Sequence, residues 1–449
     1  MEEQEKEKAL KISLKEGAFA SGSTSIAESF ITPFALALKG TSAHISILSA
    51  IGGLVSPIAQ FFGSLKMEKK SRKYIASHYS LLQAIIWLPM ALLGFLAWKG
   101  MLNSYLIYFL ILFYTFLVTF GGLSHPAWFS WMGDLVPEKH RGAYFSKRNK
   151  IIGIVGIIAF LIGGLILNLF KSGGIVLLGF SVLCLSAFIF KVFAYSLLKK
   201  QYHPKFKLKD GYYFSFFSFL RNFDNYGKFS VYFALFNFSI MIASPFFSVY
   251  MLKEMGMENN YILFTAVAVS SSVFYLLFSP LAGRFSDKYG NRPLFIIGSI
   301  LFSFNPLLWI FIKSPIILIF VPQLITGLAN AAIVISTTNF TYDAVSPQHR
   351  GLCVSYTSIL SGIGIFFGSL FGGLLLYYLH PSFIKPFVFL FAVAAATRFS
   401  VALLLIPQIK EEKKVSRLPP MHISLVHPFK TLHSDIGIVR NIIRKHRNV

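Results

Sequence analysis

The chain has 449 residues, of which 55% are hydrophobic and only 13% are charged, and its formal net charge is +24. Because soluble proteins carry about 25% charged residues, this composition excludes an ordinary soluble domain and indicates a protein solvated by lipid. The two cysteines in the whole chain argue against a disulfide framework and against a cysteine-based metal site.

The predicted elements begin with a charged cytoplasmic segment at residues 1–16, which lacks the apolar core of a cleavable signal. Apolar stretches long enough to cross about 30 Å of hydrocarbon then recur along the chain. They predict twelve membrane-spanning helices near residues 17–38, 43–65, 74–98, 104–132, 150–170, 174–197, 229–252, 260–282, 293–313, 315–341, 352–378 and 385–407. Pro33 and Pro245 predict bends in the first and seventh spans.

The predicted domains are therefore an N-terminal six-helix bundle at 17–197 and a C-terminal six-helix bundle at 229–407. A cytoplasmic central loop at 198–228 joins them. Its lysines and its aromatic run suit a segment at the lipid headgroups. A basic cytoplasmic tail follows at 408–449. Its last residues, 434–449, suit either an amphipathic helix on the inner leaflet or a disordered basic tail.

The basic residues define the topology. Of the 42 Lys and Arg residues, 34 fall on one face of the twelve-span arrangement, two lie inside spans, and six lie on the opposite face. Because cytoplasmic loops of membrane proteins are enriched in Lys and Arg, both termini are predicted to be cytoplasmic, in a multi-pass protein of the cell (plasma or inner) membrane. The net charge is thus explained by topology and membrane lipids, and no nucleic-acid partner is expected.

The two halves share an internal repeat. Residues 134–167 and 343–376 align without a gap and are identical at 13 of 34 positions, where chance would give roughly 3 or 4. In a membrane protein, two parallel halves of this size indicate a transporter fold whose site lies at the interface of the repeats.

One loop motif lies between the eighth and ninth predicted spans, and it reads Gly283-Arg284-Phe-Ser-Asp287-Lys288-Tyr-Gly290-Asn-Arg292. Together with the Asp-x6-Arg-Gly sequences at 134–142 and 343–351, this motif resembles the major facilitator superfamily. The resemblance implies an all-α integral membrane fold of two pseudo-symmetric six-helix bundles. It also implies alternating access, with spans 1, 4, 7 and 10 around a central cavity.

The resemblance further implies a cytoplasmic gate. Its candidate residues are Gly283, Arg284, Asp287, Lys288, Gly290, Arg292, Asp134, Arg141, Asp343 and Arg350. Arg284 and Arg292 are expected to pair with Asp343, and the glycines are expected to permit a tight turn. The first-half counterpart departs from the motif, because only Glu68 is available where the aspartate is expected. The alternative is an ordinary charged loop.

The candidate cavity residues are Glu28, His125, Asn237, Asn330 and Asn339. Glu28 is the one carboxylate well inside a predicted span, where it could carry a proton, receive a cationic group, or form a structural hydrogen bond. His125 precedes Pro126 and could instead bond a carbonyl freed by the proline. The asparagines could equally hold helices together.

Two basic residues fall inside spans, Lys191 in the sixth and Arg398 in the twelfth, at related positions. Because these spans are expected at the periphery, both side chains are predicted to reach toward the cytoplasmic interface. The alternative is a functional role within the membrane.

These patterns favour a secondary active transporter of a small solute, with protons as a candidate coupling ion, no cofactor, and a monomeric state. The alternatives are a lipid-binding or receptor-like protein on the same scaffold, and a membrane enzyme. An enzyme is not expected, because the spans carry no paired carboxylates and no metal-ligand spacing.

Overall fold

The computed structural model describes residues 2–67, 69–102, 105–136, 141–202, 215–221, 224–345, 349–378 and 384–412. The first half contains α1 (Glu2–Ile26), the 3-10 turn η1 (Glu28–Phe30), α2 (Ile31–Ala37), α3 (Ser42–Lys66), α4 (Arg72–Trp98), α5 (Leu106–Leu135), α6 (Arg141–Ser172) and α7 (Val176–Lys200). The second half follows the short α8 (Phe216–Arg221). It contains α9 (Asn225–Met241), α10 (Ser244–Val249), the π-turn η3 (Tyr250–Glu254), η4 (Met257–Asn259), α11 (Tyr261–Tyr289), α12 (Asn291–Phe311), α13 (Pro315–Phe320), α14 (Pro322–Ala344), α15 (Arg350–Tyr377), α16 (Pro386–Leu405) and η5 (Ile406–Gln408).

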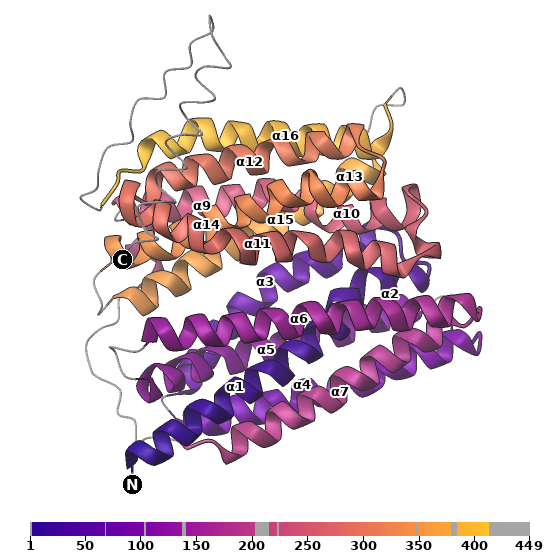
Figure 1. The fold of residues 1–449 in the computed structure, drawn as a ribbon, viewed down its shortest axis with the longest axis horizontal. Coiled ribbons are helices and arrows are strands. Elements are labelled where there is room, and N and C mark those ends of the chain that lie inside the picture. The colour runs from indigo at the N-terminus through magenta and orange to yellow at the C-terminus, as the bar shows by residue number, and fades with distance from the viewer. Residues whose placement is uncertain are drawn as a thin grey trace, which may run out of the picture.

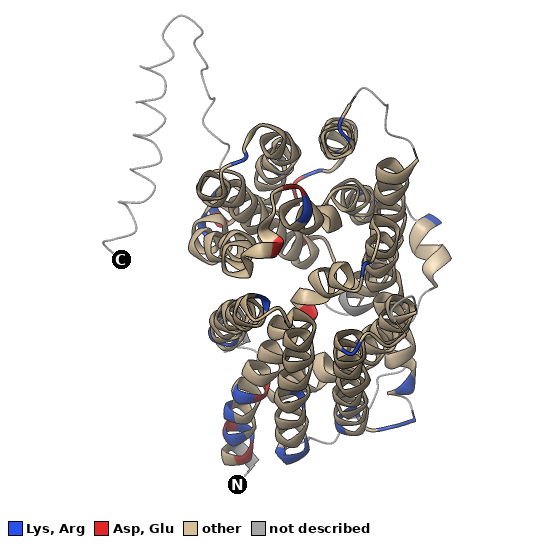
Figure 2. Ribbon diagram, turned by 90° about the vertical axis from the view of Figure 1, so that its right-hand side faces the viewer, with Lys and Arg blue, Asp and Glu red and all other residues tan. Residues whose placement is uncertain are grey.

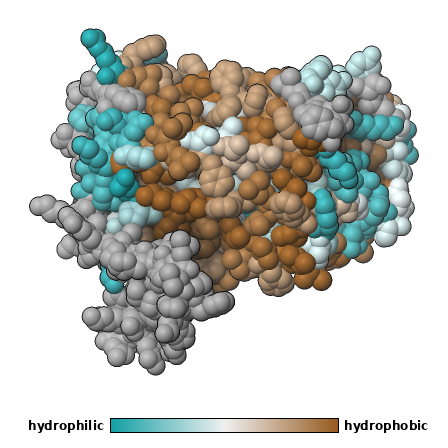
Figure 3. All heavy atoms as spheres, turned by 90° about the horizontal axis from the view of Figure 1, so that it is seen from above, coloured by the Kyte–Doolittle hydropathy of each residue, from teal (hydrophilic) through white to brown (hydrophobic). Residues whose placement is uncertain are grey.

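The all-α fold with its two sets of spans is confirmed. Within the described residues, eleven helical segments are long and apolar enough to cross a membrane. The one remaining predicted span, the first at 17–38, is the broken run α1–η1–α2, whose last helix has only seven residues. On the face seen in Figure 3, an apolar belt lies between two hydrophilic ends. Because apolar atoms have no penalty in hydrocarbon, this belt marks the part of the surface that lipid covers.

The spans form two groups of helices, with the first half below and the second half above in Figure 1, and Figure 2 shows the two groups from the side. The halves meet where α3 packs on α15, where α6 packs on α11, and where α10 packs on α2 and α3. The N-terminus of the chain and the turn between α11 and α12 lie at the same end of the molecule (Figure 1). We call this end the basic end, and the end where α2 meets α10 the opposite end.

Several helix ends differ from prediction. Helix α6 begins at Arg141 rather than near residue 150, and α11 runs to Tyr289 rather than ending near 282. Residues 2–16 are likewise the first turns of α1, where Ala9, Ser13 and Glu16 form a buried face, rather than a separate segment. The reason is that a helix continues past the hydrocarbon wherever its polar residues remain good helix formers. The central loop at 203–214 and the tail after residue 412 lie outside the described residues.

Both predicted bends are present as breaks. Helix α1 ends at Ile26, and Pro33 lies in the first turn of α2. Helix α9 ends at Met241, and Pro245 lies in the first turn of α10. A proline has no N–H to donate and its ring crowds the carbonyl four residues earlier, so the preceding turn cannot close as an α-helix.

Candidate functional site

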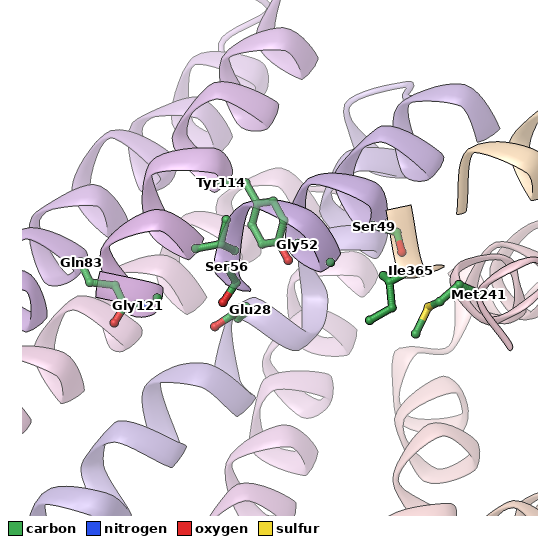
Figure 4. A pocket seen from close by; sticks show the side chains of 12 residues that line it. Glu28, Ser49, Gly52, Ser56, Gln83, Tyr114, Gly121, Met241 and Ile365 are labelled. Atoms are coloured by element: carbon green, nitrogen blue, oxygen red, sulfur yellow. The ribbon is translucent and has the colours of Figure 1, made fainter. Parts of the chain in front are cut away.

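A cavity of about 400 Å³ lies at mid-length of the molecule, and residues from both halves line it (Figure 4). The first half contributes Glu28, Ser49, Gly52, Gly53, Ser56, Gln83, Tyr114, Val118, Gly121 and Gly122, and the second half contributes Met241 and Ile365. Every hydrogen-bonding side chain of the lining thus comes from the first half. Glu28 is the one charged residue among the twelve, so the cavity carries an acidic group and no basic one.

The break in the first span puts Glu28 into this cavity. The residue opens η1, where the chain leaves the α-helical path, and its side chain is half-buried. The carboxylate interacts electrostatically with Lys191 and with the Tyr114 hydroxyl. Gly52 allows this tyrosine to lie close, because an ideal Cβ at Gly52 would come 3.0 Å from its hydroxyl oxygen. Sequence reasoning expected Glu28 at the cavity, and the structure places it there.

His125 extends the cavity face of α5 toward the basic end. It follows Tyr114, Val118 and Gly121 at spacings that keep all four on one side of the helix. Its ring is exposed and lies against Phe129, with ring centroids 6.3 Å apart. His125 is not among the twelve residues that line the cavity, so its predicted role there stays a prediction.

The three asparagines have different positions. Asn237 lies one turn before the cavity residue Met241, and its amide donates to the Phe233 carbonyl of its own helix at 2.8 Å. Asn330 is half-buried on α14, one turn before the exposed Val334. Asn339 belongs to the basic end, because its amide donates to Ser286 Oγ at 2.9 Å.

The loop motif forms a hydrogen-bonded network at the basic end. Ser286 donates to Asn291 Oδ1 at 2.5 Å, and the Asn291 amide donates to Asp343 Oδ2 at 2.8 Å. Among the described residues, neither Arg284 nor Arg292 forms an ion pair with Asp343, so the expected pairing is wrong. A buried asparagine takes the place of arginine because it reaches Asp343 from the first turn of α12.

The two motif glycines have different roles. Gly290 makes the turn between α11 and α12 with φ of 94°, a conformation that favours glycine. Gly283 instead lies inside α11, and an ideal Cβ there would meet nothing within 4 Å. Asp287 and Lys288 are exposed at the end of α11, and the Lys288 ammonium lies 4.9 Å from the Tyr289 ring centroid.

Not all gate residues can be placed. The side chains of Asp134, Arg141 and Arg350, and the whole of Glu68, lie outside the described residues. The first half nevertheless has a buried basic residue close after Glu68, which is Arg72 at the start of α4. Arg72 donates from Nη1 to both the carbonyl and the hydroxyl of Ser130, at 3.0 Å each.

Sequence reasoning missed a charged cluster beside α1. Glu16 and Arg148 are both buried, and Arg148 Nη2 lies 3.3 Å from Glu16 Oε2. The Arg148 guanidinium stacks on Trp128 at 4.3 Å, and Gly17 leaves room for it. Neither spacing nor hydropathy marks this pair, because its members are 132 residues apart.

The predicted snorkelling of Arg398 is wrong. The side chain is only 1% exposed, and its guanidinium donates to three backbone carbonyls, those of Ser239, Ile240 and Phe302, at 3.4, 3.0 and 2.9 Å. Lys191 also lies within its half, on the face of α7 that carries the buried Ala187 and Ala194, and it interacts electrostatically with Glu16 and Glu28. The related positions of the two cations in the sixth and twelfth spans were the only signal available in the sequence.

The described residues contain no group of three or more His, Cys, Asp or Glu side chains that could hold a metal ion. Cys184 and Cys353 are buried, and neither is in a disulfide.

The fold and the cavity define a class of protein, a polytopic membrane protein whose two helical halves enclose a central cavity. The sequence model described as Major Facilitator Superfamily matches residues 229–446. Two solved structures have the same fold: a D-xylose-proton symporter (TM-score 0.68, 15% identity, 91% of this chain and 99% of that one) and a bacterial homologue of the iron transporter ferroportin in an inward-facing state (TM-score 0.64, 14% identity, 90% and 99%). The second half of the chain is thus similar to the Major Facilitator Superfamily, and the whole chain has the fold of these two solved structures.

Two curated proteins are similar over shorter stretches. An uncharacterized transporter of Schizosaccharomyces pombe is 30% identical over 98 residues, and multidrug resistance protein 1 of Bacillus subtilis is 28% identical over 104 residues. These matches cover 22% and 23% of this chain, and 17% and 26% of the two relatives.

Proposed function

We propose that this chain is a secondary active transporter that moves a small solute across the cell membrane by alternating access. The observation that carries the proposal is a mid-length cavity lined by both halves of a repeat, which is where transporters of this architecture bind their substrates. Two similar proteins, a D-xylose-proton symporter and a multidrug resistance protein, support the same class.

The proposal includes a conformation and an orientation. At the opposite end, α10 packs on α2 and α3 and separates the cavity from that side. Toward the basic end, Phe129 of α5 is 61% exposed and Tyr342 of α14 is 55% exposed. With the basic end and both termini in the cytoplasm, this is an inward-open state of a plasma or inner membrane protein.

The lining favours a neutral or cationic solute over an anion. An anion would face Glu28 with no basic side chain among the lining residues to offset the repulsion. Val118, Met241 and Ile365 provide an apolar wall, while the Tyr114 hydroxyl and the Gln83 amide offer hydrogen bonds. Protons are the candidate coupling ion, with Glu28 as their carrier.

Membrane lipid covers the apolar belt, the protein acts as a monomer, and no enzymatic reaction, cofactor or nucleic acid is involved. The alternative function is a lipid-binding or receptor-like protein on the same scaffold, which would bind a ligand in the cavity without moving it.

The test is solute exchange in proteoliposomes. A panel of sugars, amino acids, peptides, organic acids, organic cations and lipids is first screened by thermal stabilisation of the purified protein at two pH values. Each stabilising solute is then loaded inside vesicles, and uptake of its labelled form is measured. Exchange that requires the protein supports transport, whereas binding without exchange by any solute supports the receptor-like alternative.

Glu28→Gln tests the coupling role, and Glu258→Gln is the matched control because Glu258 pairs with Lys253 outside the cavity. We expect the pH dependence of uptake to disappear in Glu28→Gln and to persist in the control. An unchanged pH dependence in Glu28→Gln would eliminate Glu28 as the proton carrier.

A further inference from the structure

The cavity lining contains a glutamine whose amide has a fixed orientation. Gln83 of α4 lines the cavity, and its Nε2 donates to the Leu117 carbonyl of α5 at 3.1 Å. Because a carbonyl oxygen can only accept, the amide must turn its nitrogen toward α5. Gly121 makes this approach possible, since an ideal Cβ there would come 2.8 Å from Gln83 Nε2 but 4.0 Å from Oε1 (Figure 4). The free end of the amide is therefore its oxygen, which is an acceptor.

The next residue of α5 adds a backbone acceptor. Gly122 also lines the cavity, and without a side chain it does so with backbone atoms only. Its carbonyl lacks the usual helical donor, because Pro126, four residues later, has no N–H. The second half shows what such a carbonyl binds, since the Phe302 carbonyl, four residues before Pro306, accepts from Arg398 Nη1 at 2.9 Å. A cationic N–H donor is therefore a suitable partner for the Gly122 carbonyl.

The other polar side chains of the lining do not supply an excess of donors. Glu28 accepts through its carboxylate, and the Ser49 hydroxyl is already paired with the Ser369 hydroxyl at 2.9 Å. The Ser56 and Tyr114 hydroxyls can accept as well as donate. None of the twelve lining residues is a Lys, Arg or Trp, whose side chains only donate. The donors must therefore come from the ligand.

The lining from the second half is apolar. Figure 4 shows Met241 and Ile365 on the other side of Glu28 from Gln83. A ligand that suits both sides has a head with several N–H donors and an apolar body. A primary ammonium group has three N–H donors and one positive charge, whereas a quaternary ammonium group has the same charge and no N–H. The quaternary group would leave Gln83 Oε1 without a donor, which costs binding free energy.

Gln83 could instead serve only to join α4 to α5. Gln323 of α14 is an example of that structural role, because its Nε2 donates to the Val267 carbonyl at 2.8 Å and its side chain is buried outside the cavity. The two glutamines thus make the same kind of bond between helices, and they differ in that Gln83 lines the cavity. This difference provides a matched control.

We propose that the cavity takes an amphipathic primary amine, and that Gln83 selects for the N–H groups of its ammonium head. The head donates to Gln83 Oε1, to the Gly122 carbonyl and to the Glu28 carboxylate. The apolar body lies against Met241 and Ile365. This proposal rests on the proposed function and names its substrate class: Glu28 selects for positive charge, and Gln83 distinguishes primary from quaternary ammonium groups of equal charge.

The test compares two probes of equal charge, 2-phenylethylammonium and its N,N,N-trimethyl derivative, by calorimetric titration of the purified protein at neutral pH. Wild type should bind the primary amine at least about tenfold more tightly than the quaternary one. In Gln83→Met this preference should fall below about threefold, because the primary amine binds more weakly while the quaternary affinity is unchanged. Gln323→Met removes a similar bond between helices outside the cavity and should keep the wild-type preference.

A second variant moves the amide without removing it. Gly121→Ala adds a methyl group where Gln83 Nε2 lies. Because the amide is the end of a flexible side chain, it can shift and the fold should persist, but the preference for the primary amine should fall. A loss of affinity for both probes alike would indicate a merely structural role for Gln83.

Equal binding of the two probes by wild type overturns the proposal, and so does the absence of binding by both. An unchanged preference in Gln83→Met overturns it as well, and should that variant not fold, an unchanged preference in Gly121→Ala does so. In each case, exchange of another solute in proteoliposomes would leave the proposed function intact. Preferential binding of the primary amine without exchange of any solute would support the site and refute the transporter.

Discussion

A single methyl group added where α9 packs against α15 should lower the stability of the protein. Gly364, Gly368 and Gly372 lie one turn apart on α15 and face carbonyl oxygens of the chain around α9. An ideal Cβ at Gly368 would come 2.2 Å from the Phe238 carbonyl oxygen, and Cβ atoms at the other two would come 2.1 Å from theirs. These distances fall about 1 Å short of ordinary van der Waals contact between such atoms.

In Gly368→Ala the two helices must therefore move apart, since a backbone carbonyl cannot rotate away as a side chain can. Overpacking of this kind costs about 1–3 kcal/mol. The gain in helix propensity from glycine to alanine returns at most about 1 kcal/mol. Because the neighbouring glycine contacts must open as well, we expect a net loss of about 2 kcal/mol in the free energy of unfolding.

The assay is reversible unfolding in mixed detergent micelles, followed by circular dichroism, and Gly283→Ala is the matched control. Gly283 also lies inside a helix, but an added Cβ would meet nothing within 4 Å, so this variant should be as stable as wild type or up to about 1 kcal/mol more stable. Equal stability of Gly368→Ala and Gly283→Ala would refute the close packing of α9 against α15.

Three further outcomes are expected. Ser46→Ala removes the 2.7 Å hydrogen bond from the Ser46 hydroxyl to the Ser369 carbonyl, which joins the two halves. The present arrangement of the halves should lose about 0.6 kcal/mol relative to other arrangements, as measured from spin-label distance distributions. An unchanged distribution would contradict this role. Gly17→Ala puts a Cβ 2.5 Å from Arg148 Nη2, the end of a side chain that can shift, so the thermal midpoint should fall by an amount equivalent to only about 1 kcal/mol, the low end of overpacking costs; a fall as large as that of Gly368→Ala would contradict this. Gly290→Ala forces alanine to φ of 94° and should destabilise the protein by about 1–3 kcal/mol; wild-type stability would mean that the turn can rearrange.

The features that sequence reasoning obtained correctly depend on local chemistry. Span positions follow from the cost of placing polar groups in hydrocarbon, and that cost acts on each segment separately. The breaks before Pro33 and Pro245 follow from the missing N–H and the ring of proline. Glu28 was expected at the cavity because it is the one carboxylate well inside a predicted span and because the family resemblance places the first span there; its side chain lines the cavity.

The features that sequence reasoning missed depend on pairs of residues far apart in the chain. Arg398 was expected to reach the interface because its span was expected at the periphery, where a charge facing lipid is costly. The break in α9, 158 residues earlier, leaves carbonyl acceptors that offset this cost. Similarly, Asp343 accepts from Asn291 rather than from an arginine, and Asn339 bonds Ser286 rather than facing the cavity. The spacing of residues in the sequence identifies such side chains, but it does not determine which residues they contact in the fold.

The repeat explains why the two halves differ most in their polar side chains. Both halves need the same backbone break, and both have a proline for it. The polar groups at the two breaks have different surroundings. Glu28 faces a cavity, whereas Ile240 accepts a hydrogen bond from Arg398 through its backbone carbonyl. The lining follows the same division, with hydrogen-bonding groups in the first half and Met241 and Ile365 in the second. Substitutions in the first half should therefore change which solute binds, whereas substitutions of Met241 or Ile365 should change mainly how much apolar surface the solute can bury.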